Sequence, residues 1–194
     1  FGADVYGTKA RVIRIEADVS DGLPSFAMVG FPSAQVREAQ ERVRTAFKNN
    51  RLCLPPKKVT VNFAPADMKK EGAGFDRPVA AAVLAAAGIL EPDLLEGVMI
   101  VGEISLNGEI HGVAGVLPRV IRARELGLRF CVIPEENIRE GNLVKDMPVF
   151  GVKSLNAMIR CLRDPNTYTA AYQEKEKTEN KPEIPKVDFA DICG

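Results

Sequence analysis

The chain has 194 residues, of which 46% are apolar, enough for one ordinary globular core with or without a tail. Its 26 lysines and arginines balance 26 aspartates and glutamates, which argues against an autonomous nucleic-acid-binding protein but leaves room for a local basic patch. Four scattered cysteines and one histidine make a zinc site improbable, and they indicate a reduced, cytoplasmic protein. No apolar run approaches the roughly 20 residues that span a bilayer, so we expect no membrane contact.

The first half of the chain predicts two strands and a helix. Residues 11–19 alternate apolar and charged side chains, the pattern of a half-buried strand. Residues 25–29 predict a second strand that runs antiparallel to the first, because the link between them is short. Ser33 is a candidate N-cap for a helix over residues 34–48.

That helix carries a basic stripe on one flank. The stripe consists of Arg37, Arg44 and Lys48, at offsets of seven and four residues. Its functional interpretation is contact with phosphates. The alternative is a solvated surface, on which Glu41 pairs with Arg37 and Arg44.

Residues 64–87 form the stretch around which the rest of the chain is arranged. A strand at 59–63 leads into a charged, Gly-rich loop, and an Ala-rich helix at 78–87 follows. A helix that is apolar all round is expected to be central. The loop between them contains no Ser, Thr, Cys or His, so it offers no nucleophile. Its charged residues favour an ion-paired recognition or assembly surface over a pair of catalytic carboxylates at Glu71 and Asp76; they are Asp67, Lys69, Lys70, Glu71, Asp76 and Arg77.

The second half alternates strands and helices. Within residues 98–113, Asn107-Gly108 predicts a hairpin with a type I′ turn. The remaining elements are predicted at 117–126 (helix), 130–134 (strand), 135–140 (one helical turn), 148–152 (strand) and 154–162 (helix, capped by Ser154). Together these patterns predict an α+β fold with a mixed sheet packed against helices. Residues 164–186 have the composition of a polar linker.

Several motifs carry a resemblance to a known family: GLPSFAMVGFP, VREAQERVRTAFKN, PPKKVTVNFAPAD, KKEGAGFDRPVAAAVLAA and VGEISLNGEIHGVAGVLP. Residues 1–163 resemble the N-terminal Lon-protease-like (ChlI-type) domain of the ComM/YifB family of Mg-chelatase-like AAA+ ATPases. Residues 187–194, VDFADICG, resemble the start of the ATPase module, cut off at the domain boundary. The sequence contains no GxxxxGK[ST] motif. The resemblance therefore implies no cofactor in this fragment, and ATP with Mg in the missing module.

The resemblance also implies a ribosomal protein S5 domain 2-like fold, shared with the proteolytic domain of Lon. Lon-like proteases use a Ser–Lys dyad. Matching the motifs places Gly74 where the serine would be and Leu117 where the lysine would be. We therefore expect no peptidase activity. We expect His111 to be a packed or surface residue, because no serine or cysteine lies beside it in sequence, and Ser105 to be a strand residue.

The function implied by the resemblance is that of a non-catalytic accessory domain of a DNA branch-migration helicase in natural transformation. Its partners would be its own AAA+ module, sister subunits of a hexamer, and DNA. The candidate DNA or subunit contacts are Arg37, Arg44, Lys48, Lys69, Lys70 and Arg77. Two alternatives stay open: a Lon-like serine peptidase, and part of a magnesium-chelatase-like subunit, although no residue here supports metal insertion.

Overall fold

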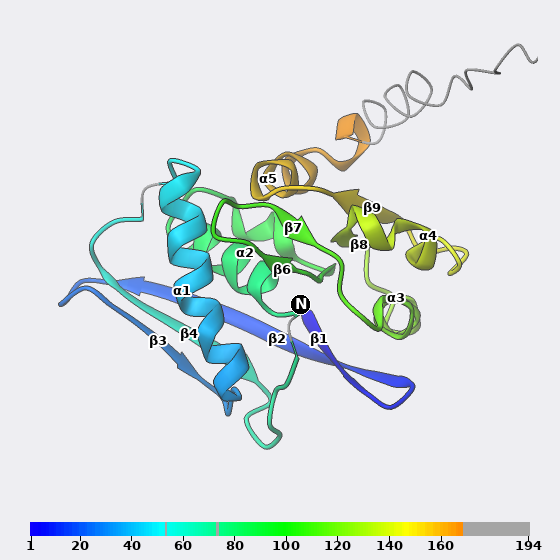
Figure 1. Cartoon of the computed structure of the whole chain (residues 1–194), viewed down its shortest axis with the longest axis horizontal. Coiled ribbons are helices and arrows are strands. Elements are labelled where there is room, and N and C mark those ends of the chain that lie inside the picture. The colour runs from blue at the N-terminus through cyan, green and yellow to red at the C-terminus, as the bar shows by residue number, and fades with distance from the viewer. Residues whose placement is uncertain (53, 73, 169–194) are drawn as a thin grey trace, which may run out of the picture.

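The described chain is an α+β structure built on two sheets, with helix α2 between them (Figure 1). The computed structural model describes residues 1–52, 54–72 and 74–168. The predicted start of an ATPase module at 187–194 and most of the predicted linker lie outside these residues. The predicted α+β class with a mixed sheet is confirmed.

The first sheet has four strands in the order β1-β2-β4-β3. Their bounds are Gly2–Tyr6 (β1), Lys9–Ser20 (β2), Ser25–Val29 (β3) and Lys58–Ala64 (β4). Strand β3 does run opposite to β2, as its short link predicts, but the two do not pair. Instead β4 lies between them, antiparallel to β2 and parallel to β3. The alternating pattern of β4 turns Val59, Val61 and Phe63 into the core.

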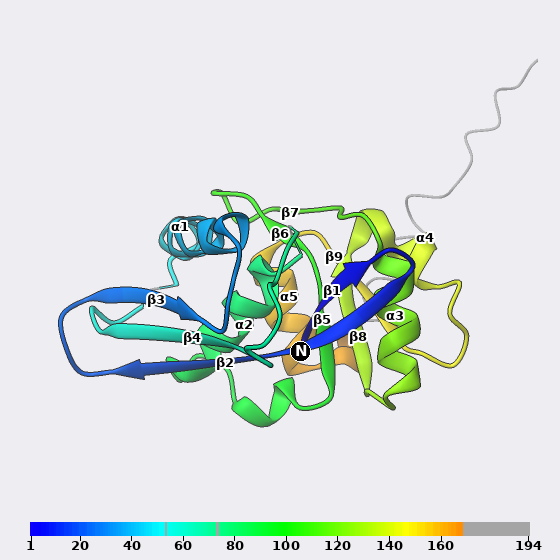
Figure 2. The same ribbon diagram turned by 90° about the horizontal axis from the view of Figure 1, so that it is seen from below.

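Two helices pack against this sheet. Helix α1 (Ala34–Asn49) begins at Ser33, whose hydroxyl accepts a hydrogen bond from the Val36 amide as predicted for an N-cap. Helix α2 (Asp76–Ala86) is buried along most of its length and contacts both α1 and β2 (Figure 2). Its small side chains allow this close approach from several sides, which confirms the central position predicted from its composition.

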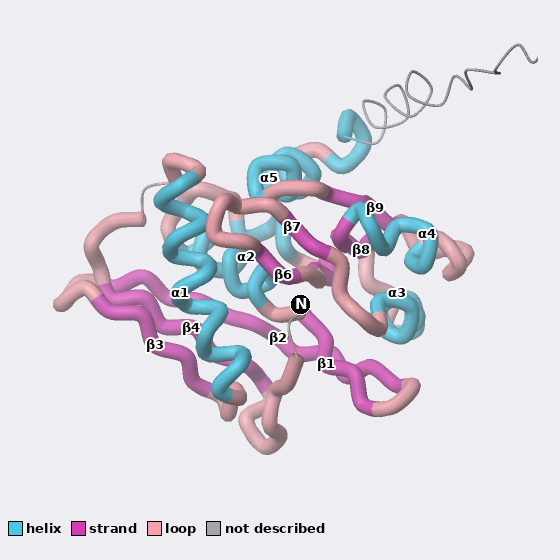
Figure 3. Tube along the Cα trace, in the orientation of Figure 1, coloured by secondary structure: helices cyan, strands magenta, loops and turns pink. Residues whose placement is uncertain are grey.

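The second sheet consists of three parallel strands in the order β5-β8-β9. They are Val98–Ile100 (β5), Phe130–Pro134 (β8) and Val149–Val152 (β9). The helices of this half are η1 (Pro92–Leu95), α3 (Val116–Glu125), η2 (Glu135–Asn137), α4 (Ile138–Gly141) and α5 (Leu155–Arg163) (Figure 3). Ser154 caps α5 by accepting from the Ala157 amide, as predicted.

A short hairpin, β6 (Glu103–Ile104) and β7 (Ile110–His111), lies outside both sheets. The hairpin was predicted, but its turn is not type I′. The Ser105 amide donates to the Glu109 carbonyl, so three residues form the loop, and of these only Gly108 has a positive φ, at 89°. Type I′ would need a positive φ at Asn107 as well. The same sequence is compatible with a type I turn followed by Gly108 in the left-handed conformation.

Strand β8 joins two hydrophobic clusters. Phe130 and Val132 belong to the larger one, which contains the four-stranded sheet, α2 and α5. Cys131 and Ile133 belong to the second, which contains α3. The packed region extends beyond α5, since the Tyr168 hydroxyl donates to the Gly151 carbonyl in β9.

Candidate nucleic-acid or subunit interface

The basic stripe of Arg37, Arg44 and Lys48 is exposed along α1. The burial of Val36, Ala39, Val43 and Phe47 on the opposite side of the helix turns these three cations to solvent. Glu41 was the expected partner in the alternative interpretation, but no ion pair to any member of the stripe occurs among the described residues; the Glu41 carboxylate instead accepts from the Gln40 side chain. The three cations therefore remain available to an anionic partner.

Arg42, on the neighbouring flank of α1, has a structural role that sequence reasoning missed. Its guanidinium donates twice to Asp76 at the start of α2, with Nε–Oδ2 2.7 Å and Nη2–Oδ1 2.9 Å. The buried Asp76 carboxylate also accepts from the Ile104 amide of the hairpin. The bond to Asp76 raises the pKa of Arg42. The pair thus fixes α1, α2 and the hairpin to one another.

Two of the predicted contact residues are buried. The Lys70 side chain is 0% exposed, and its ammonium donates to the carbonyls of Gly30, Met68 and Pro65, at 2.7 Å for the first two. Burial lowers the pKa of Lys70. These bonds join the loop after β4 to the loop before α1, so the Lys70 side chain acts within the fold.

Arg77 is likewise 0% exposed, in the first turn of α2. Its Nη1 donates to the Val101 carbonyl, while Nε and Nη2 have no partner among the described residues. Burial lowers its pKa to about 9, so the guanidinium is still charged at neutral pH. The apolar sequence that follows Arg77 was the available signal that this part of α2 lies inside.

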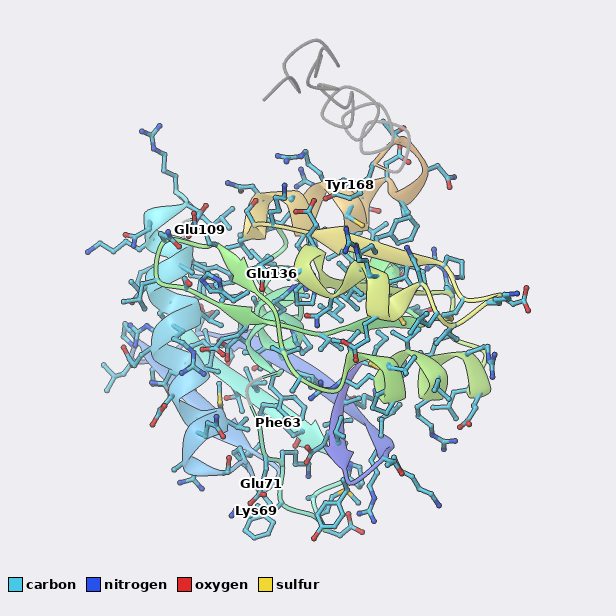
Figure 4. The ribbon with its side chains drawn as sticks, turned by 45° about the vertical axis from the view of Figure 1, so that its right-hand side comes forward. Phe63, Lys69, Glu71, Glu109, Glu136 and Tyr168 are labelled. Atoms are coloured by element: carbon cyan, nitrogen blue, oxygen red, sulfur yellow. The ribbon has the colours of Figure 1, made fainter. Side chains whose placement is uncertain are left out.

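Lys69 alone among the loop cations faces solvent. Its ammonium lies 2.6 Å from the Glu71 carboxylate, and both side chains are more than half exposed. Figure 4 shows this pair at the opposite end of the molecule from Tyr168. Glu71 is thus exposed and paired with Lys69, whereas Asp76 is buried and paired with Arg42, so the two carboxylates have different partners.

Gly74 and Leu117, the two positions matched to the Ser–Lys dyad, lie in apolar or buried surroundings. Gly74 is buried, and a Cβ added there would lie 3.2 Å from Nη2 of Arg119. Arg119 is itself 5% exposed and is held by the carbonyls of Ala3, Ala114 and Gly115. Leu117 packs against the second hydrophobic cluster. The cation nearest to Gly74 in this region is thus a guanidinium on α3.

The hairpin brings together three polar side chains that sequence reasoning kept apart. Nε2 of His111 lies 2.5 Å from the Ser105 hydroxyl, and its Nδ1 lies 3.9 Å from the Glu136 carboxylate. His111 is exposed, as expected, but a serine six residues away in sequence lies beside it in space. The six-residue separation across a hairpin was the signal that could have revealed this contact. The Nδ1 distance exceeds hydrogen-bond range, so Glu136 does not orient the ring in the way a catalytic triad requires.

The described residues offer neither a cluster of metal ligands nor a membrane-spanning helix. Within them, no group of three or more His, Cys, Asp or Glu side chains is arranged to hold a metal ion. None of the helices in the described part of the chain combines the length and apolar character needed to cross a membrane.

Comparison with known proteins identifies relatives for nearly the whole chain. The model of a family described as "Subunit ChlI of Mg-chelatase" matches residues 15–137, which lie inside the described domain. The competence protein ComM of Haemophilus influenzae is 36% identical over 189 residues, covering 97% of this chain and 37% of its own length.

Two further relatives are more partial matches. The uncharacterized protein YifB of Salmonella typhimurium is 42% identical over 138 residues, which cover 71% of this chain and 27% of YifB. The DNA repair protein RadA of Listeria monocytogenes is 27% identical over 168 residues, which cover 81% of this chain and 34% of RadA. The chain thus spans less than two-fifths of the length of each relative.

Proposed function

The chain belongs to the Mg-chelatase-like family of subunit ChlI, with ComM and YifB among its relatives, and on that premise we propose that it is a non-catalytic accessory domain of an AAA+ ATPase. Within the longer protein it would contact DNA or help to assemble the ring. The names of two relatives, a competence protein and a DNA repair protein, support a DNA-directed motor over a metal-inserting one.

We further propose how the longer protein that contains this chain is divided into domains. Residues 1–163 would form an S5 domain 2-like domain, residues 164–186 a linker, and residues 187–194 the start of the ATPase module. ATP and Mg would bind in that module, and sister subunits would complete a hexameric ring in the cytoplasm. Support comes from the greater length of the relatives, which leaves room for such a module.

The observation that carries the DNA contact is the exposed basic stripe on α1. Lys48 lies eleven positions after Arg37, so the stripe extends over about 16 Å of helix at about 1.5 Å per residue. No carboxylate among the described residues neutralises it through an ion pair. Its length and charge suit consecutive phosphates along one groove of a duplex.

The test is binding of the 194-residue chain to a fluorescent 20-base-pair duplex. If three phosphates are contacted, the association constant should fall by about 40-fold between 50 and 200 mM salt, following a slope of about −0.9 per contact. The triple variant Arg37→Gln, Arg44→Gln, Lys48→Gln should lose most of that salt dependence. A matched control replaces three exposed cations elsewhere, Arg139, Lys145 and Arg160, by Gln.

Equal losses in both triple variants would show that only net charge matters and would contradict the proposed contact. The peptidase alternative has one observation in its favour, the short contact between Ser105 and His111. Turnover of fluorogenic casein that the change Ser105→Ala abolishes would replace our proposal by that alternative.

A further inference from the structure

A groove separates the β1–β2 hairpin from helix α3, on a part of the molecule that the basic stripe does not reach. Its cavity volume is about 690 Å³. Figure 2 shows the hairpin projecting beside α3, away from α1. We refer to this groove as the hairpin–α3 groove. Sequence reasoning did not identify it, because its two walls are more than 100 residues apart in the chain.

The groove is lined by apolar and charged side chains. The apolar lining comes from the hairpin, from the loop after β4 and from α3 and its C-cap: Ala10, Val12, Pro65, Met68, Pro118, Ile121 and Leu126. The charged lining residues are Lys9, Arg11, Arg122 and Glu125, a net charge of 3 − 1 = +2. Because the whole chain has a formal net charge of zero, this excess is a local feature.

Two of the cations are free to bind an anion. Neither Lys9 nor Arg11 forms an ion pair with a carboxylate among the described residues. Arg122 is 2.9 Å from Glu125 and is therefore partly neutralised. Lys9 and Arg11 are two residues apart on β2, which places them about 7 Å from one another at about 3.4 Å per strand residue.

An exposed aromatic ring lies beside these cations. Tyr6, at the end of β1, is 78% exposed and pairs across the turn with Lys9. The Arg11 guanidinium lies 5.9 Å from the centroid of the Tyr6 ring, and its Nη1 lies 3.9 Å from the Met68 sulfur. Arg11, which lines the groove, thus lies over the Tyr6 ring, and most of the Tyr6 side chain remains exposed for stacking.

We propose that the hairpin–α3 groove binds single-stranded nucleic acid, with phosphates at Lys9 and Arg11 and a base stacked on Tyr6. A positively charged groove combined with an exposed aromatic side chain is the arrangement by which proteins bind single strands without sequence preference. An acidic peptide would bind the same cations, but its binding would not require stacking on the Tyr6 ring. This inference deepens the proposed function, since a motor that separates or moves DNA strands exposes single-stranded DNA.

The test measures binding of the 194-residue chain to fluorescent oligo(dT) of 20 nucleotides at several salt concentrations. In the double variant Lys9→Gln, Arg11→Gln, the dependence of log affinity on log salt should lose about 1.4 from its slope, at about 0.7 per contact. Tyr6→Ala should weaken binding by about tenfold at every salt concentration, because stacking is not screened. The charge-matched control is Arg139→Gln, Lys145→Gln. An oligonucleotide containing 5-bromodeoxyuridine should crosslink to the peptide that carries residues 6–11.

Unchanged oligo(dT) binding in the Lys9/Arg11 variant, or crosslinks that map elsewhere, would overturn the inference. A glutamate-rich 20-residue peptide that competes as well as oligo(dT), with no effect of Tyr6→Ala, would assign the groove to acidic peptides instead. Duplex binding that depends on the α1 stripe while oligo(dT) binding ignores the groove would leave the proposed function intact. If the wild-type chain binds neither oligonucleotide, both the DNA contact and the groove assignment are wrong.

Discussion

At the scale of single residues, neighbours in sequence have opposite roles. Lys69 is exposed beside Glu71, whereas Lys70 is completely buried with three carbonyls around its ammonium. The sequence Lys-Lys-Glu predicts a charged loop correctly, but it does not specify which lysine turns inward. That choice depends in part on the carbonyl of Gly30, from a loop 40 residues earlier. Gly30 is needed there because its φ is 90° and a Cβ would lie 2.1 Å from the Phe63 carbonyl oxygen.

We predict that Lys70→Met lowers the free energy of unfolding by about 2–4 kcal/mol, because three carbonyls lose a charged donor. The adjacent change Lys69→Met is the matched control and should stay within about 0.5 kcal/mol, since an exposed ion pair contributes little. Urea unfolding followed by circular dichroism measures both. Equal effects in the two variants would mean that the bonds around Lys70 contribute no more than a surface pair.

At the scale of secondary-structure elements, periodicity predicted most helices and strands, while their partners depended on contacts distant in sequence. The sequence predicted the helix α1 and its start at Ser33. It did not reveal the partner of Arg42 on this helix. Asp76 lies 34 residues away, and only the packing of α2 against α1 brings the two together. Strand β3 illustrates the same limit, since β4 inserts between it and β2.

The Arg42–Asp76 ion pair should couple helices α1 and α2 strongly. We predict that Arg42→Met lowers the free energy of unfolding by about 3–5 kcal/mol, because it leaves a buried carboxylate without its partner. The double variant Arg42→Met, Asp76→Leu should lose less than the single variant, since it removes the buried charge as well. The control Arg122→Met breaks the more exposed pair with Glu125 and should cost no more than about 1 kcal/mol. A double-mutant cycle by urea unfolding gives the coupling, and additive effects would contradict it.

At the scale of the whole molecule, the fold class followed from the order of predicted strands and helices, but the candidate site did not. Of six predicted contact residues, Lys70 and Arg77 are buried, because the sequence shows their charge and not their depth. The hairpin–α3 groove went unrecognised because it forms only when the first strand pair packs beside a helix from the second half. What unites these halves is β8, whose alternating side chains enter both hydrophobic clusters.

The shared strand leads us to expect that the two clusters unfold as one unit, and two thiols can report this. Cys131 lies in the second cluster and Cys161 in the larger one, and both are buried. Burial raises the pKa of each thiol to about 12, so at pH 8 only about one in 10⁴ is a thiolate in the folded chain. Alkylation by iodoacetamide then requires unfolding, which returns each thiol to a pKa of about 8.5.

In a Cys53→Ser, Cys193→Ser background, both thiols should therefore become reactive at the same urea concentration, measured by a short iodoacetamide pulse and peptide mass spectrometry. In the folded chain at pH 8, both thiols should stay almost unreactive, because they are buried and burial keeps them protonated. If Cys131 were alkylated at clearly lower urea than Cys161, α3 and its cluster would open separately. The hairpin–α3 groove would then belong to a unit that can be displaced without unfolding the domain.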